Sequence, residues 1–580
     1  MASDNYLLVA AIDFGTTYSG YAFSTKHDFR TDPTQMSLVQ WVAGSAGMVS
    51  QKASTCVLFK PDRTFHSFGY EAEDKYLNLT LDKDHEDWYL FRRFKMNLYN
   101  TKLDREVQLT DYSGEKKMPL IDVISATIAY LKSKLMKQCR EQGTGVNDSE
   151  VRWVLTVPTI WTDPAKQLMR EAAEKAGLDK RQLILCLEPE AASVFCKHIP
   201  VGKRVFGDRV EFQAGSKYMV IDAGGGTIDI TVHKVQKDGH LREILVASGG
   251  DWGGTKVDEA FESYLEDIIG KQAFGQFKSD HLYDLLDLMR RFEVKKRLNK
   301  VKHSDKVTVS IPSSLLSTYN KLNPGQNIKE NIAKNERFSS HVEFFGDKLR
   351  LSGTKTASLF DESIEQIVYH VSKLLRDPKV RGISAILMVG GYSECPLLLD
   401  AIRHIAGGVQ LIVPNEAGLA VLKGAVVIGH SPSTISERIC KFTYGVETHL
   451  PFKKRKHKNE YRVIDESGKK LCSFAFDRFV KKGNAVKFHE HAQARRYVPV
   501  TASQTSIVFS IYASNNEKPV YVTDANCQKI GEIKVDMPDT TRGLKRVVCV
   551  SMCFGGSEID IKAVDEDTGQ VVRASCDFLG

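Results

Sequence analysis

The stretch that decides the fold is residues 219–229, MVIDAGGGTID, in which an apolar segment ends at Asp222 and a glycine-rich turn follows. Residues 9–17, VAAIDFGTT, repeat this plan near the start of the chain, with Asp13 in the corresponding position. The residues after each turn alternate with a period near two, which predicts a second strand. Each stretch therefore predicts a hairpin, and the pair indicates a duplicated fold that grips one ligand from both sides.

Glycine-and-threonine turns of this kind suit an anion. Glycine reaches positive φ and lets the backbone approach a ligand closely, and successive N–H groups form a concavity for anions. Threonine hydroxyls add further donors. Neither turn has the Gly-Lys-Ser/Thr of a Walker loop, and neither runs into a helix as a Rossmann turn does. The sequence therefore predicts two phosphate-binding hairpins, although an ordinary glycine turn is the alternative for either one alone.

The two aspartates need a different partner, because a carboxylate repels phosphate. Magnesium prefers oxygen ligands and keeps several of its waters. We therefore expect Asp13 and Asp222 to face each other across a magnesium–phosphate cluster and to hold the ion through water.

The composition is that of a soluble globular protein. The 580 residues are 42% hydrophobic and 26% charged, which is ordinary for such proteins, and this length predicts several domains. No apolar run approaches the roughly 20 residues of a membrane helix, so we expect no membrane span. The 11 cysteines are scattered without a Cys-x-x-Cys pair, which favours reduced thiols and a cytoplasmic location.

The net charge is +8, and most of the excess lies after Lys441. One basic run, KKRKHK, extends from Lys453 to Lys458. A nuclear signal or an anion patch is one interpretation, and a solvated hairpin loop is the favoured one. Nucleic-acid binding requires a longer basic stripe with interleaved aromatic residues, so no nucleic-acid partner is predicted.

Elements of alternating type follow each hairpin. Helices are expected over residues 120–142, 164–177, 191–196, 281–300 and 417–428, and strands over 151–158, 183–187 and 383–389. This alternation predicts an α/β architecture with the ligand at the strand ends. We divide it into a first half of about residues 1–216 and a second half of about 217–430.

The character of the chain changes after a linker at residues 431–440. Strands are expected over residues 505–512, 520–523, 547–553 and 558–564, and no convincing amphipathic helix follows Ile439. Residues 441–580 therefore predict a small antiparallel β-sandwich.

Five motifs in a fixed order make nearly the whole chain resemble the 70-kDa heat-shock chaperone family, in its divergent branch named heat shock 70 kDa protein 12. They are the two hairpins (residues 13–19 and 222–229), a first connecting segment (188–192), an adenosine turn (390–393) and a second connecting helix (418–426). The resemblance implies a duplicated actin-like (ribonuclease H-like) ATPase fold with two lobes at residues 1–430. It also implies that the β-sandwich binds substrates or partners and that the family's helical lid is missing.

The resemblance also assigns roles to individual residues. The groups around magnesium, phosphate and the attacking water would be Asp13, Lys95, Glu188, Asp222 and Asp229. The phosphate donors would be Gly15, Thr16, Thr17, Gly224, Gly225, Gly226 and Thr227. The adenosine contacts would be Glu293, Lys296, Arg297, Gly390, Gly391 and Tyr392.

Several of these residues have other interpretations. Glu188 alone is also compatible with a loop acid, Lys95 with a solvated basic face, and Asp229 with a structural ion pair. Lys296 and Arg297 are also compatible with exposed helix positions. Tyr392 replaces a small residue, so it either stacks on adenine or blocks it. The linker lacks the family's leucine-rich acidic stretch, which leaves its coupling role open.

The resemblance implies an ATP-binding, slowly hydrolysing, chaperone-like stress-response protein that uses ATP or ADP with magnesium. Nucleotide state would be coupled to client or signalling proteins bound by the β domain, and nucleotide-exchange partners are possible. The alternative is a nucleotide-sensing scaffold with little or no ATPase activity. A small-molecule kinase of the same superfamily is disfavoured, because such kinases place an acceptor pocket between the lobes and the C-terminal part here is all β.

Overall fold

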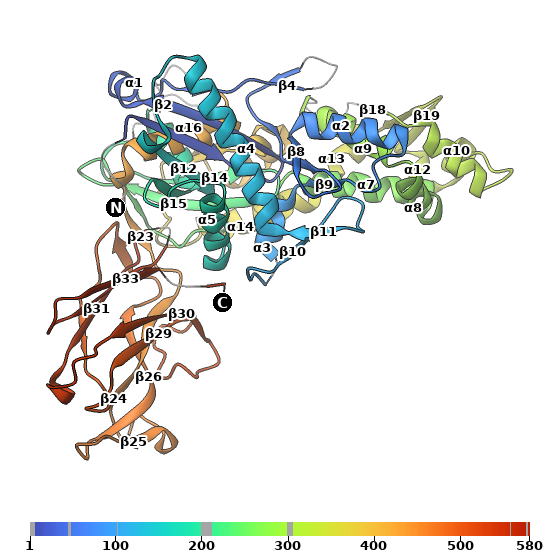
Figure 1. Cartoon of the computed structure of the whole chain (residues 1–580). Helices are drawn as coiled ribbons and strands as arrows, with labels where there is room; N and C mark the ends of the chain where they lie inside the picture. Colours follow the sequence, from blue (N-terminus) through green and yellow to red (C-terminus); the bar gives the residue numbers. More distant parts are fainter. Residues whose placement is uncertain are drawn as a thin grey trace.

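A computed structural model describes residues 6–43, 48–100, 102–198, 212–298, 306–556, 558–575 and 578–579. In Figure 1 the chain up to helix α16 (Ala420–His430) forms an elongated body, and the strands after it form a second body below. The chain passes between them through strand β23 (Ile435–Ile439).

The first hairpin lies in the middle of a sheet. The strands in spatial order are β13 (Leu183–Leu187), β12 (Val151–Val157), β1 (Leu8–Asp13), β2 (Tyr18–Thr25) and β3 (Ser37–Leu38), with β6 (Ala53–Ser54) also on β2. β1 runs parallel to β12 and antiparallel to β2. All six residues of β1 are buried, as expected for a strand with both faces covered. Asp13 is therefore carried on a rigid central strand.

The second hairpin lies in a sheet of the same plan. Its strands in order are β22 (Gln410–Ile412), β21 (Ala385–Val389), β14 (Lys217–Ala223), β15 (Ile228–Val235), β16 (Leu241–Glu243), β23 and β27 (Ala485–Lys487), with β17 (Ser248–Gly250) also on β15. β14 is parallel to β21 and antiparallel to β15. The predicted strand after each glycine turn is thus present in both sheets.

Two helices pack between these sheets. They are α6 (Glu188–His198) and α16, and their buried side chains share one cluster with β1 and β14. A Cβ at Gly424 of α16 would overlap the Ala191 carbonyl of α6, so glycine allows the helices to cross in direct contact. This close packing joins the two sheets through one apolar layer.

The other long helices lie outside these two sheets. On the first half these are α2 (Tyr70–Asp82), α4 (Leu120–Glu141) and α5 (Asp163–Lys175); on the second, α7 (Thr255–Ile269), α8 (Lys271–Asp280), α9 (Leu282–Leu298), α10 (Ser313–Leu322), α14 (Asp361–Leu375) and α15 (Pro396–Ile405). α5 begins at Asp163 with Pro164 in its first turn, a favourable position for proline. α12 (Glu336–Ser339) and β19 (Val342–Phe345) lie with α8 and α10 at one end of the body (Figure 1). The chain between α9 and α14 also contains β18 (Val307–Ser310), α11 (Ile328–Lys334), β20 (Lys348–Leu351) and α13 (Gly353–Ser358).

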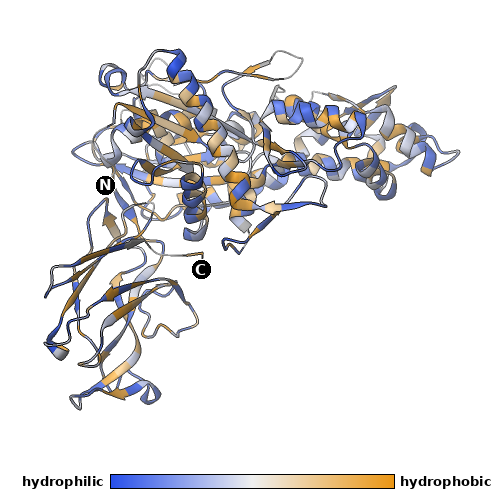
Figure 2. Cartoon of the chain, in the orientation of Figure 1, coloured by the Kyte–Doolittle hydropathy of each residue, from blue (hydrophilic) through white to orange (hydrophobic). Residues whose placement is uncertain are grey.

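The chain after β23 forms two sheets that share one core. One has β25 (Arg462–Ile464), β26 (Lys470–Val480), β24 (Thr443–Pro451), β29 (Ser506–Ser514) and β30 (Cys527–Asp536); the other has β28 (Arg495–Tyr497), β31 (Val548–Cys553), β32 (Asp560–Asp565) and β33 (Val571–Ser575). Buried residues of β24, β29, β30, β31 and β32 form a single cluster. Figure 2 shows apolar and polar residues mixed along the strands of this body. Buried and less buried positions alternate along β31 and β32, as expected for strands with one buried face.

The prediction of a strand at residues 520–523 is wrong. This segment is a turn whose only strand-like contact in the described chain is an isolated bridge between Tyr521 and Ala475. The carboxylate of Asp524 accepts hydrogen bonds from the N–H groups of Val520 and Tyr521, which closes the turn locally. β24, β26 and β30 were not predicted.

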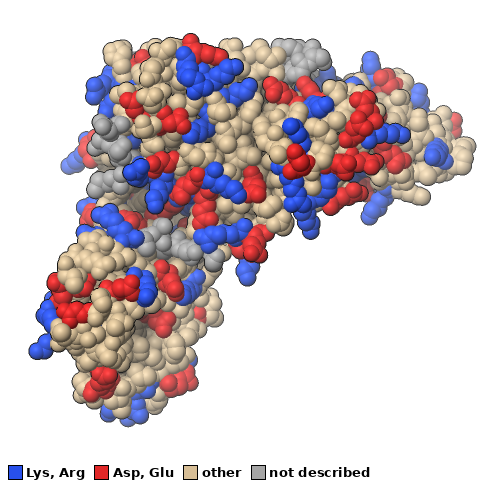
Figure 3. All heavy atoms as spheres, viewed as in Figure 1, with Lys and Arg blue, Asp and Glu red and all other residues tan. Residues whose placement is uncertain are grey.

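The charged residues and the apolar helices of the described chain can be compared with what the sequence predicts. In Figure 3, Lys and Arg are interspersed with Asp and Glu on the viewed face. The basic run lies in the connection between β24 and β25, where most of its side chains are exposed. Among the described helices, none combines the length and apolar character required to cross a membrane.

Candidate functional site

The two hairpins open onto one cavity of about 450 Å³. Its lining includes both acidic strand ends, both turns and most of the predicted adenosine contacts: Asp13, Gly15, Thr16, Thr17, Lys95, Glu188, Asp222, Gly224, Gly225, Gly226, Thr227, Glu293, Lys296, Gly390, Gly391 and Tyr392. These residues are distant in sequence and come from both halves of the nucleotide-binding part of the chain. The structure therefore brings together the positions that the sequence analysis selected, apart from Asp229, which is not in the lining, and Arg297, whose side chain lies outside the described residues.

The tips of the hairpins approach each other closely. A Cβ at Gly225 would overlap the Thr17 hydroxyl, and one at Gly226 would lie 2.6 Å from the Thr16 hydroxyl. Neither position has room for a side chain, so glycine is required at both. The buried Thr17 hydroxyl oxygen has no hydrogen-bond partner among the described residues, which leaves it available to a ligand.

The backbone of the second hairpin is held by the loop at residues 253–255. The N–H groups of Gly253, Gly254 and Thr255 donate to the carbonyl oxygens of Gly226, Gly224 and Gly225. Three consecutive hairpin carbonyls are thereby directed at this loop. Oxygen atoms that would repel phosphate are thus occupied within the protein.

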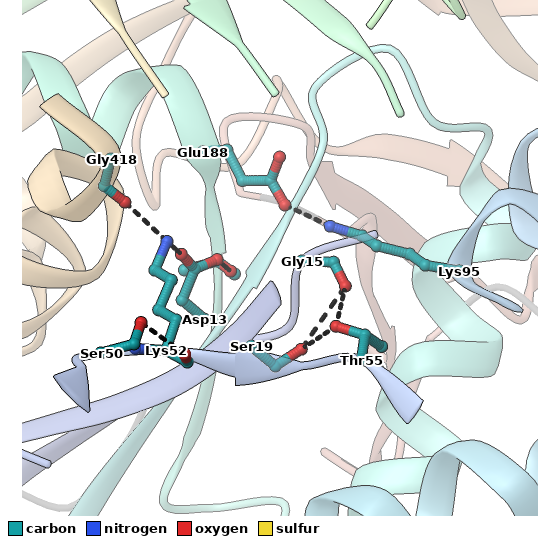
Figure 4. Close-up of polar contacts among 10 residues, drawn as sticks. Asp13, Gly15, Ser19, Ser50, Lys52, Thr55, Lys95, Glu188 and Gly418 are labelled. Atoms are coloured by element: carbon teal, nitrogen blue, oxygen red, sulfur yellow. Dashed lines mark hydrogen bonds and ion pairs between the residues drawn. The ribbon is translucent and has the colours of Figure 1, made fainter. Parts of the chain in front are cut away.

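The first hairpin is held from its outer side by Thr55 (Figure 4). The Thr55 hydroxyl donates to the Gly15 carbonyl at 2.8 Å and shares a 2.8 Å hydrogen bond with Ser19. The Thr55 N–H also donates to the Thr17 carbonyl at 2.8 Å. These bonds fix the turn before any ligand arrives.

Asp13 is buried and paired with a lysine that the sequence analysis did not select. Its Oδ2 lies 2.6 Å from Lys52 Nζ, and its Oδ1 accepts a 2.7 Å hydrogen bond from Thr156. Burial opposes ionisation, but the charge and hydrogen bond of Lys52, the charge of Lys95 and the hydrogen bond of Thr156 together outweigh it, and the pKa of Asp13 is lowered. The Asp13 carboxylate is therefore charged and already holds a cation.

Lys95 is buried and forms an ion pair with Glu188. Lys95 Nζ lies 2.5 Å from Glu188 Oε1 and 5.2 Å from the centre of the Trp161 ring. Burial raises the pKa of Glu188 to about 7, although Lys95 opposes the shift. The pair lines the cavity, so neither residue is a solvated surface group.

Asp222 is buried at the cavity wall. No described residue donates a hydrogen bond to its carboxylate. Burial raises the pKa of Asp222 well above its usual range, and neighbouring carboxylates raise it further. Asp229 is not among the residues that line the cavity. Its Oδ1 accepts a 3.0 Å hydrogen bond from the Ile160 N–H, and its buried Oδ2 has no hydrogen-bond partner among the described residues.

The predicted adenosine contacts on α9 are fixed by ion pairs. Lys296 Nζ lies 2.6 Å from both Asp258 and Glu293. Asp258 of α7 also binds Arg93, from the first half of the chain, at 2.7 Å. Lys296 is therefore part of a charge network that crosses between the halves. The side chain of Arg297 lies outside the described residues.

The turn at residues 390–393 forms another wall of the cavity. Gly390 has a φ of +85°, and a Cβ there would lie 2.5 Å from Asp222 Oδ1, so this conformation and this contact both require glycine. Tyr392 is mostly buried, with its ring packed on Phe360 and its hydroxyl bonded to Ser363. Its ring is thus held in the core and contributes only part of its surface to the cavity.

Comparison with known proteins identifies the family. The model of the family described as Hsp70 protein matches residues 9–478. The chain belongs to the Hsp70 family. It is 34% identical to Heat shock 70 kDa protein 12B of Homo sapiens over 642 residues, which covers 99% of this chain and 91% of that protein. It is 33% identical to Heat shock 70 kDa protein 12A of Mus musculus, with 99% and 92% covered, and 23% identical to Chaperone protein DnaK of Prochlorococcus marinus (strain MIT 9515), with 76% and 62% covered.

Membership of the Hsp70 family confirms the resemblance that the ordered motifs indicated. It supports an ATP-binding, chaperone-like function and a mixed α/β fold consistent with an actin-like ATPase. Hsp70 proteins generally bind ATP or ADP with magnesium.

The residues of this Hsp70 chain fit a hydrated magnesium ion better than a directly bound one. Asp13, Asp222 and Glu188 offer carboxylate oxygens to the same cavity, the ligand type magnesium prefers. The described part of the chain has no group of three acidic, histidine or cysteine side chains close enough to hold an ion directly. Asp222 is open to a hydrated ion, whereas both oxygens of Asp13 are engaged.

Strand β23 connects this site to the C-terminal sheets. Arg438 of β23 makes a bidentate ion pair with Glu190 of α6, at 2.6 and 2.8 Å. It also donates to the carbonyl of Gly555, after β31, at 2.9 Å. The Ile439 N–H donates to the buried Glu243 carboxylate at 2.7 Å. Glu190 is two residues from Glu188, so one helix end contacts both the cavity and the connection.

Sequence reasoning missed Lys52, Asp258, Arg93 and the Glu190–Arg438 pair. Lys52 lies in a short bend before β6, where no periodicity marks it. Its partner is 39 residues away, and Arg438 is 248 residues from Glu190. The one sequence signal for the Glu190–Arg438 pair was that Glu190 lies two residues from Glu188 in the first connecting segment.

Proposed function

We propose that this protein is an ATP-binding, slowly hydrolysing chaperone-like Hsp70 protein that couples its nucleotide state to client or partner binding. The observation that carries the proposal is the convergence of two glycine hairpins and two acidic strand ends on one cavity. In this proposal residues 1–430 form two actin-like lobes, of about residues 1–216 and 217–430, and the two C-terminal sheets form a β-sandwich over residues 441–580 that binds clients.

The proposed roles follow from the contacts of each residue. The hairpin N–H groups and the Thr16 and Thr17 hydroxyls hold the phosphates. Lys95 places its positive charge beside the terminal phosphate as that phosphate is transferred to water. Glu188, once deprotonated, orients the attacking water. Asp13 and Asp222 face the region of the ion, and bound magnesium neutralises charge on the phosphates.

The proposed coupling passes through the start of α6. Glu188 pairs with Lys95 in the cavity, and Glu190 holds Arg438 of β23. A shift of this helix end on nucleotide binding changes both contacts at once. Partners that exchange nucleotide would act on the same cleft, and the scattered cysteines support a reducing, cytoplasmic location.

Calorimetry and peptide binding together test this function. We expect one ADP or ATP per chain with micromolar affinity or tighter. We also expect ATP to speed the release of a fluorescein-labelled unfolded peptide several-fold relative to ADP, measured by anisotropy decay. A chain that binds neither nucleotide in calorimetry contradicts the proposal.

The rate of phosphate release should rise as the pH is raised through about 7. Burial raises the pKa of Glu188 to about 7, so the carboxylate that orients water is formed only above that pH. The folded chain holds this proton more tightly than the unfolded chain, so the group's contribution to stability falls as the pH rises from about 4.5 to 7. Steady-state phosphate assays between pH 5.5 and 8.5 should show this rise in wild type, and Glu188→Gln should give a low, flat profile. An equal rise in Glu188→Gln would assign the titration to another group.

The second candidate is a nucleotide-sensing scaffold with little or no ATPase activity, in which the C-terminal sheets hold signalling partners. The observation that favours it is the engagement of Asp13 by Lys52, which competes with a hydrated magnesium ion. Single-turnover measurements with bound ATP separate the candidates. Release of phosphate faster than from the Asp222→Asn variant supports the ATPase, and equal rates support the scaffold.

A further inference from the structure

A lysine ammonium lies inside the proposed nucleotide cavity, at the acidic end of the first hairpin strand. Lys52 Nζ is 2.6 Å from Asp13 Oδ2 and donates to the Gly418 carbonyl at 2.7 Å (Figure 4). The Lys52 side chain is 17% exposed, and it lines the cavity. Since an ammonium has three N–H groups, these two bonds leave one donor for a further acceptor.

The position of the Lys52 ammonium is fixed by backbone contacts of Lys52 and its neighbours. The backbone N–H of Lys52 donates a hydrogen bond to the Ser50 hydroxyl at 3.3 Å, and the next two residues pair with β2. Gly20, the neighbour of Asp13 across the hairpin, leaves space for the side chain, since a Cβ there would lie 3.0 Å from Lys52 Cγ. The lysine therefore reaches Asp13 along a path that a glycine keeps open.

The same ammonium joins the two halves of the cavity. Asp13 belongs to the first sheet, and Gly418 lies beside Gly391 of the predicted adenosine turn, where a Cβ at Gly418 would be 3.7 Å from the Gly391 Cα. A positive charge is thus fixed between the first hairpin and the surface expected to hold the base. In sites where carboxylates and nucleotide phosphates share a hydrated magnesium ion, that ion neutralises the charge of both groups.

We propose that Lys52 is a built-in cation that neutralises Asp13 and a phosphate oxygen of bound ADP, so that this chain binds ADP tightly even without the divalent ion on which hydrolysis depends. The inference rests on the proposed nucleotide function. Lys52 keeps Asp13 from repelling the phosphates, and its remaining donor is available to a phosphate oxygen. Its charge is covalently attached, so chelators cannot remove it.

The test compares ADP affinity in 5 mM magnesium chloride with that in excess EDTA, by calorimetry on the full chain. For wild type we expect the dissociation constant to rise by less than about threefold in EDTA. Lys52→Met keeps the length of the side chain and removes the charge, so its dissociation constant should rise by about 30-fold or more in EDTA. Lys52→Arg keeps the charge and should behave as wild type does.

The control is Lys60→Met, at an exposed position after β7 (Cys56–Phe59), which should match wild type in both buffers. Binding by wild type only in magnesium overturns the inference and leaves the nucleotide function intact. The absence of ADP binding in both buffers overturns the nucleotide function and the inference with it. Equal, small EDTA effects in wild type and Lys52→Met also overturn the role of Lys52. The wild-type comparison needs no variant, so it decides whether tight ADP binding requires a divalent ion even if a substitution prevents folding.

Discussion

Replacing Asp222 with asparagine should reduce magnesium-dependent phosphate release by about 100-fold while leaving the protein folded. The loss is expected because Asp222 is the acidic strand end with no hydrogen-bond donor from another described residue, and it is therefore the carboxylate open to a hydrated ion. Removal of a group that stabilises developing charge typically costs two to three orders of magnitude in rate, about 3 to 4 kcal/mol.

The effect on stability should be small or favourable. Burial and the neighbouring carboxylates raise the pKa of Asp222, which means that its charged form is disfavoured in the folded chain. Asparagine has nearly the same shape and no charge, so Asp222→Asn relieves this repulsion. Thermal unfolding followed by circular dichroism should give a midpoint equal to or above that of wild type.

Asp400→Asn is the matched control for this prediction. Asp400 is exposed on α15 and pairs only locally with Arg403, and exposed pairs of this kind contribute little. The control should leave both the rate and the melting midpoint unchanged. Wild-type rates in Asp222→Asn would show that this carboxylate has no part in the reaction.

Replacing Arg438 with methionine should release β23 from the nucleotide-binding part of the chain. The substitution removes the bidentate partner of the buried Glu190 and the bond to the Gly555 carbonyl. Breaking a buried ion pair by removing one partner costs about 3 to 5 kcal/mol, because it leaves an unpaired buried charge. Amide hydrogen exchange over β23 should accelerate by about 100-fold or more.

A double variant separates the ion pair from the packing of the arginine. In Glu190→Gln with Arg438→Met, no unpaired charge is left buried, so a large part of the loss should be recovered. The coupling between nucleotide and peptide release should stay weakened, because the helix end no longer holds β23. Arg462→Met, an exposed arginine on β25, provides the control. Unchanged exchange in β23 of Arg438→Met would show that this strand is held by its backbone pairing alone.

The sequence was most informative where function constrains the backbone itself. Each hairpin requires glycine for space and an acid at the strand end, and these requirements leave short, readable motifs. Gly225 and Gly390 illustrate this, because a side chain at either position would overlap the opposite hairpin or Asp222. Helix α4, which has a clear apolar face, was also predicted to within one residue of its observed ends.

What the sequence could not show depends on contacts between distant residues. The ammonium of Lys52 reaches Asp13 from an irregular bend, and long flexible side chains leave no periodic signal. The docking of residues 435–439 as a strand between β16 and β27 needs partners on both sides, which local propensity does not encode. The Tyr392 ring was left with two alternatives, and its packing on Phe360 was visible only in three dimensions.

The central claim is that both hairpins clasp one nucleotide in the cavity between the two sheets. A crystal structure of the full chain grown with ADP tests it most directly. The account predicts phosphate density between the Thr16–Thr17 turn and the Gly225–Gly226 turn, with the base against Gly390 and Gly391. Density for ADP elsewhere on the chain, or phosphates in contact with only one hairpin, would contradict it.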